Sequence, residues 1–93
     1  MTAKYSFATA LKTVRKARGL SQEAFSDVSS RTYMSTLERG LKSPTLKKLE
    51  EICEVLNIHP LALIALAYAE NDTNKANLLL GQAQQELQKI NNP

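Results

Sequence analysis

The feature that most constrains this sequence is the helical spacing of its apolar residues in short segments separated by stop signals. Phe7, Leu11 and Val14 fall at positions i, i+4 and i+7, and Gly19 follows where a left-handed helix stop is expected. No segment alternates apolar and polar residues as a half-buried strand would. The pattern predicts an all-α fold with helices over about residues 7–18, 22–28, 31–39, a segment ending near 56, 61–69 and 74–90. The helix that ends near 56 begins with either Ser43 or Thr45 as its cap.

Length and composition exclude several classes of protein. A chain of 93 residues suffices for one domain with one modest core. One cysteine and one histidine argue against a disulfide framework, a metal site and a catalytic triad. Because the chain has no GxGxxG, no P-loop and no nucleophile–base set, we do not expect an enzyme. We expect Cys53 to be a buried structural thiol and His59 to cap a helix, with no cofactor. No apolar run reaches the roughly 18 residues of a membrane span, and no signal peptide is evident. A cytoplasmic protein without a membrane partner is therefore expected.

Charge is distributed unevenly along the chain. Residues 1–48 carry ten Lys and Arg against three Asp and Glu, which gives this half a net charge of +7. Residues 49–93 carry two Lys against six Asp and Glu, a net charge of −4. A basic half is typical of proteins that bind a polyanion such as nucleic acid. A solvated basic face without a ligand explains the charge alone equally well.

The predicted helix over 31–39 has two chemically different faces. At 100° per residue, Met34, Leu37 and Glu38 share the stripe that should face the core. The remaining surface carries hydroxyl and guanidinium groups and no acid: Arg31, Thr32, Ser35, Thr36 and Arg39. Such groups form hydrogen bonds with base edges and phosphates. A short polar helix face is common, so this pattern is a weak signal by itself.

Glu38 is the more informative residue, because it lies on the apolar stripe. A buried carboxylate is costly without a partner. On the first predicted helix, Arg15 lies on the same face as Leu11. The pattern therefore predicts a structural ion pair between Arg15 and Glu38, with Arg18 as a competing donor that reaches water more easily.

Together these residues resemble the phage-repressor-like helix-turn-helix family, often called the XRE family. The most specific match pairs Gly-Leu-Ser-Gln, ending at Gln22, with Leu-Glu-Arg-Gly, ending at Gly40. The resemblance covers residues 7–66 and is strongest to the small controller proteins of restriction-modification systems. It implies a five-helix domain whose second and third helices read DNA, followed here by an extra C-terminal helix.

The resemblance also implies site residues. It places Arg31, Thr32 and Thr36 at base edges, and Gln22, Arg39, Lys42 and Ser43 at the phosphate backbone. From the helix face itself we add Ser35 to the expected base contacts, and we expect Tyr33 to contact phosphate. For Tyr33, packing against the following turn is the alternative. The family has an Arg–Glu pair at the positions of Arg15 and Glu38. One departure stands out, since the segment from Gln22 to Met34 is about two residues shorter than in the family. A shorter turn can change the angle of the third helix and leaves room for a protein-binding role.

The last predicted helix extends past the family resemblance. Ala76, Leu80, Ala83, Leu87 and Ile90 are spaced 4, 3, 4 and 3 residues apart, as in a coiled-coil seam. We expect Leu80, Ala83, Leu87 and Ile90 to form a dimer interface, joined by Leu63 and Leu66 of the fifth helix. The alternative is that this helix folds back across the first and fifth helices. The expected domains are 1–70, which binds DNA, and 71–93, which dimerises or packs.

Two functions follow from these observations. The first is a homodimeric, sequence-specific transcriptional regulator that binds double-stranded DNA through the major groove. The alternative is a protein-interaction module, such as an antirepressor or an antitoxin-like protein, which uses the helical scaffold to bind another protein.

Overall fold

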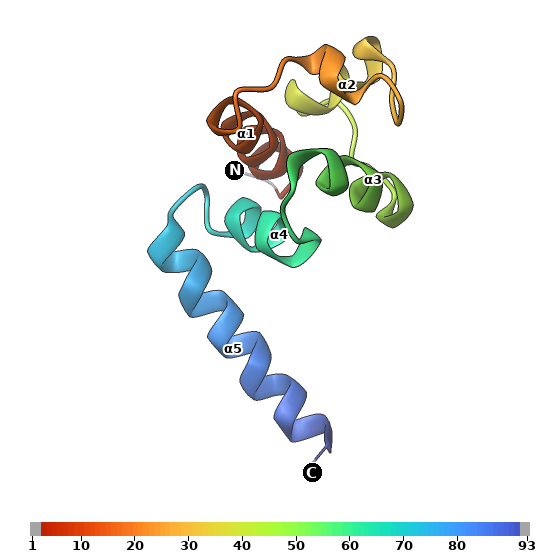
Figure 1. Cartoon of the computed structure of the whole chain (residues 1–93). Helices are drawn as coiled ribbons and strands as arrows, with labels where there is room; N and C mark the ends of the chain where they lie inside the picture. Colours follow the sequence, from red (N-terminus) through yellow and green to blue (C-terminus); the bar gives the residue numbers. More distant parts are fainter. Residues whose placement is uncertain (1–2, 92–93) are drawn as a thin grey trace.

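The computed structural model describes residues 3–91, with side chains from residue 6 onward. This range contains no strand, which confirms the all-α prediction (Figure 1). Its helical segments are α1 (Ala3–Ala17), the single 3-10 turn η1 (Gln22–Phe25), α2 (Arg31–Glu38), α3 (Leu46–Leu56), α4 (Pro60–Tyr68) and α5 (Thr73–Asn91). The predicted five-helix domain with an added C-terminal helix is thus present, with η1 as its short second helix.

The first helix begins at Ala3, four residues earlier than predicted, and the second is shorter than predicted. A helix over about 22–28 was expected, but helical geometry ends at Phe25. The backbone N–H groups of Val28 and Ser29 both donate to the Phe25 carbonyl, at 2.9 and 2.8 Å, and reverse the chain there. Phe25 itself is fully buried and anchors the turn in the core. The chain therefore passes from η1 to α2 through a short turn over residues 26–30.

Two predicted caps are settled by hydrogen bonds. The Thr45 hydroxyl accepts from the backbone N–H of Lys48 at 3.1 Å, so Thr45 and not Ser43 caps α3. The Nδ1 atom of His59 accepts from the backbone N–H of Leu61 at 3.0 Å, which confirms the capping role of the histidine.

The core lies between α1, η1, α2, α3 and α4. Its fully buried side chains come from all five elements and include Leu11, Phe25, Met34, Leu37, Ile52, Leu56 and Leu63. The expectation that Leu63 faces a dimer partner is therefore wrong. Leu66 is half-buried against the same core. α4 is apolar on all sides because α1, α3 and α5 all pack against it. The apolar side chains that α4 does expose are Leu61 and Tyr68.

The C-terminal helix α5 leaves the body of the molecule (Figure 1). Its first turns pack on α4, where Ala76 meets Ala65 and Ala69. Farther along, Leu87 and Ile90 are 62% and 74% exposed. Most of α5 therefore does not fold back across α1 and α4.

The start of α5 is held in place by the segment before it. Glu70 and Asn71 both have left-handed backbone conformations, with φ of 53° and 68°, and they turn the chain out of α4. The Asn71 side-chain amide donates to the Thr13 hydroxyl of α1 at 2.9 Å. Asp72 then accepts from the backbone N–H of Lys75 at 3.1 Å. These contacts fix the direction in which α5 projects.

No single helix within residues 3–91 is long and apolar enough to cross a membrane. α3 and α4 reach that length only as a pair, across a bend of 102°.

Cys53 provides a test of the core. It is 2% exposed, and its burial raises the pKa of the thiol from 9.0 to about 11. Below pH 9 the folded protein should therefore contain about a hundredfold less thiolate than the unfolded chain, and the thiolate is the reactive form. Labelling of Cys53 at pH 8 by a small disulfide reagent should be slower by about that factor than in urea-unfolded protein. Equal labelling rates would contradict a buried thiol.

Candidate nucleic-acid interface

A bidentate ion pair between α1 and α2 supports the candidate site. The Arg15 Nε donates to Glu38 Oε2 at 2.6 Å, and the Arg15 Nη2 donates to Glu38 Oε1 at 2.9 Å. The two side chains are only 11% and 4% exposed. The hydrogen bond to Glu38 raises the pKa of Arg15, against the opposite effect of burial. The predicted pair is thus present, and it fixes the recognition-helix candidate α2 against α1.

The same pair also holds the chain between α1 and η1. The third donor of the guanidinium, Nη1 of Arg15, binds the Leu20 carbonyl at 2.8 Å. The Gln22 amide donates to Glu38 Oε1 at 3.2 Å. Gln22 was expected to contact phosphate. Its amide nitrogen carries two N–H donors, so the contact with Glu38 leaves one for a phosphate oxygen.

The residues expected to contact bases share the outer surface of α2. Arg31 and Thr32 are exposed, and Ser35 and Thr36 are half-buried. The Thr36 hydroxyl donates to the Thr32 carbonyl at 2.8 Å, so its oxygen is left as an acceptor. The Arg31 Nη1 pairs with Glu23 Oε1 at 3.0 Å, a contact that the sequence pattern did not predict. Hydroxyl and guanidinium groups therefore lie together on one helix face.

The beginning of α2 is fixed by a cap. The Ser30 hydroxyl accepts from the backbone N–H of Tyr33 at 3.0 Å. Tyr33 itself is half-buried against the core, and both its expected phosphate contact and its packing against the following turn stay predictions.

The expected phosphate contacts that follow α2 lie at the surface. Arg39, Lys42 and Ser43 are all exposed, in the segment between α2 and α3. No group of three or more His, Cys, Asp or Glu side chains in the described part of the chain could hold a metal ion.

Two cations of the basic half serve the fold instead. Arg18 is exposed, as expected, and it also donates to the carbonyls of Leu56 and Asn57 at 2.9 and 3.0 Å. It thereby caps the C-terminus of α3, where the helix dipole favours a positive charge. The sequence signal for this role was the position of Arg18 at the very end of the first helix.

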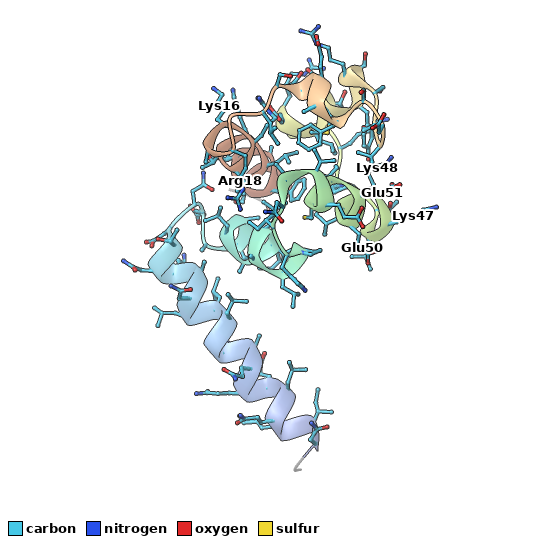
Figure 2. The ribbon with its side chains drawn as sticks, in the orientation of Figure 1. Lys16, Arg18, Lys47, Lys48, Glu50 and Glu51 are labelled. Carbon is cyan, nitrogen blue, oxygen red and sulfur yellow. The ribbon has the colours of Figure 1, made fainter. Side chains whose placement is uncertain are left out.

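Lys48 closes the turn between η1 and α2. Its ammonium group donates to the Val28 carbonyl and lies 3.4 Å from Glu51 Oε1 (Figure 2). The neighbouring Lys47 extends away from the molecule (Figure 2). The only sequence signal for the role of Lys48 was the short turn itself, which leaves carbonyl groups without helical partners.

Removing one member of the buried pair should destabilise the fold strongly. Glu38→Ala would leave Arg15 buried without its carboxylate, and we expect the free energy of unfolding to fall by about 3 kcal/mol. Chemical denaturation followed by circular dichroism measures the loss. The matched control is Glu54→Ala on α3, an exposed position where the change should stay within about 0.5 kcal/mol. Equal stability of the two variants would contradict the role given to the pair.

Comparison with known proteins agrees with this geometry. A helix-turn-helix family model matches residues 11–63, which is more than half of the chain. No curated protein and no solved structure was found to match. The stronger likeness to restriction-modification controllers stays a prediction. The matched family binds DNA and is non-enzymatic. The matched residues include the Arg15–Glu38 pair, η1 and α2, and the chain belongs to the phage-repressor-like, or XRE, family of helix-turn-helix DNA-binding regulators.

Proposed function

We propose that the protein is a sequence-specific transcriptional regulator that binds double-stranded DNA as a homodimer, with α2 in the major groove. The observation that carries the proposal is the outer surface of α2, where Arg31, Thr32, Ser35 and Thr36 lie together. The major groove admits an α-helix and presents a distinct pattern of donors and acceptors for each base pair. Met34 and Leu37 bury the opposite side of α2 completely, so this helix cannot roll to present another face.

Charge around α2 supports the same assignment. Arg39, Lys42 and Ser43 follow α2 and are exposed, and Gln22 precedes it at the start of η1. Contacts of this kind to phosphates position a protein on the duplex, while base contacts select the sequence. Binding should therefore weaken steeply as the salt concentration rises.

A continuous apolar stripe on α5 supports the homodimer. Ala76 and Leu79 form its first part and are covered by α4. The same stripe continues along the helix as Leu80, Ala83, Leu87 and Ile90, which lie on exposed turns. A second copy of the chain would cover the exposed Leu80, Leu87 and Ile90. We assign residues 1–70 to DNA binding and residues 71–93 to dimerisation.

A protein-interaction module is the second candidate, and the exposed stripe on α5 also favours it. In that case, α5 binds a different protein and the helix-turn-helix acts as a scaffold. A gel shift with duplex DNA at increasing salt separates the two candidates. Loss of the shift at higher salt supports the regulator, and no shift with any upstream fragment supports the interaction module.

Base reading and phosphate binding predict different mutant behaviour. Arg31→Ala should reduce discrimination between operator and random DNA by about 1–3 kcal/mol, the value of a good bidentate base contact. Lys42→Ala should instead weaken binding to all sequences alike and reduce the salt slope by about one unit. Titrations of both variants against operator and random duplexes measure this. An equal loss on every sequence for Arg31→Ala would assign Arg31 to phosphate instead.

The dimer seam can be tested with a matched pair of double variants. Leu80→Glu with Leu87→Glu places two charges on the stripe and should give a folded monomer that binds DNA weakly. Leu78→Glu with Gln85→Glu places the same charges at the same seven-residue spacing, about 160° around the helix, and should stay dimeric. Light scattering gives the mass of each variant. A seam variant that remains dimeric and binds DNA normally would exclude α5 as the dimer contact.

A further inference from the structure

An exposed ion pair crosses the shortened turn beside the outer surface of α2. The Arg31 Nη1 lies 3.0 Å from Glu23 Oε1, and the side chains are 72% and 69% exposed. Arg31 is the first residue of α2, and Glu23 is the second residue of η1. We propose that Glu23 is a positioning residue, which holds the guanidinium of Arg31 for base recognition and so sets discrimination at one base pair. This inference rests on the proposed function of α2.

An exposed carboxylate is unusual in this part of the chain, which is otherwise strongly basic. Residues 1–48 contain only three acids, and one of them, Glu38, is buried in the ion pair with Arg15. Glu23 and Asp27 are therefore the exposed acids of the basic half. A carboxylate beside a DNA-binding surface repels phosphates and weakens non-specific binding. Among the described residues, the ion pair of Glu23 is with Arg31, which points to a role that acts through this arginine.

The short turn brings the two side chains together on well-anchored backbone. Phe25, two residues after Glu23, is fully buried. Its carbonyl accepts from the N–H groups of Val28 and Ser29, which reverse the chain. On the other side, Ser30 caps α2 directly before Arg31. The ion pair therefore joins two anchored elements, whose backbone brings the two side chains within reach of each other.

The geometry of the guanidinium leaves room for a base. Arginine has five N–H donors in a planar fork, and the hydrogen bond to Glu23 uses a single Nη1 donor. The remaining donors can form a bidentate contact with O6 and N7 of guanine. Arg31 also lies at the positive end of the helix dipole, and the carboxylate offsets the unfavourable placement of a cation there. Glu23 thus orients Arg31 and competes with phosphates for it.

Two effects on DNA binding follow. The ion pair holds Arg31 away from phosphates, so non-specific binding is weaker. Because the guanidinium is already oriented, Arg31 loses less side-chain freedom when it binds the correct base. Exposed ion pairs are screened by solvent and salt, so both effects are moderate. We expect Glu23→Gln to strengthen binding to random DNA about two- to fivefold and to reduce discrimination about three- to tenfold at one base pair.

The test uses the full chain and an operator obtained by selection, with every base pair of the operator substituted in turn. The glutamine variant should lose discrimination at the same base pair as Arg31→Ala. In the Arg31→Ala background, Glu23→Gln should cause no further loss there. The matched control is Asp27→Asn, which removes one exposed negative charge from the neighbouring turn. It should strengthen binding to random DNA without changing the base-pair profile.

Three outcomes would overturn the inference. If Glu23→Gln and Asp27→Asn gave the same base-pair profile, Glu23 would act only through its negative charge and would not position Arg31. A loss at a different base pair from Arg31→Ala would make Glu23 a base contact itself. If Arg31→Ala left the whole profile unchanged, base recognition by Arg31 in the proposed function would fail, and the inference would fail with it. Thermal melting of each variant confirms that it is folded.

Discussion

The bidentate contact between Arg15 and Glu38 is the interaction on which the arrangement of the candidate DNA-binding surface depends. It joins α1 to α2, and through Leu20 and Gln22 it also fixes the entry into η1. A buried ion pair contributes little net stability compared with apolar packing, but it penalises any arrangement that separates its two members. The pair therefore selects one orientation of α2 against the body.

Some of the cationic side chains in the basic half bind backbone carbonyl groups of the protein itself. Arg15 binds the Leu20 carbonyl between α1 and η1, Arg18 binds the Leu56 carbonyl at the end of α3, and Lys48 binds the Val28 carbonyl in the short turn. The net charge of residues 1–48 is thus larger than the charge available to phosphates. Arg31, Arg39 and Lys42, which lie in α2 or directly after it, are among the cations that remain exposed.

The features that could be predicted from the sequence are those that follow from helical periodicity, or from one residue that is costly to bury without a partner. Glu38 on an apolar stripe required a cation, and helical phase assigned Arg15 to it. The shape of η1 was not predictable, because helical spacing over seven residues says little about where tight packing of Phe25 ends a helix. Leu63 was misassigned since α4 is apolar on every side, and only its neighbours decide which leucine is buried. The roles of Arg18 and Lys48 depend on carbonyls 20 or more residues away.

The most direct test of the account is selection of DNA from a random library, with the mass of the complex measured in parallel. If α2 reads bases and α5 joins two copies, the selected sites should be two-fold symmetric. Their half-sites should be centred about 10 base pairs, or roughly 34 Å, apart and be bound by two chains. Selection that enriches no sequence, or an asymmetric site bound by a single chain, would contradict the account.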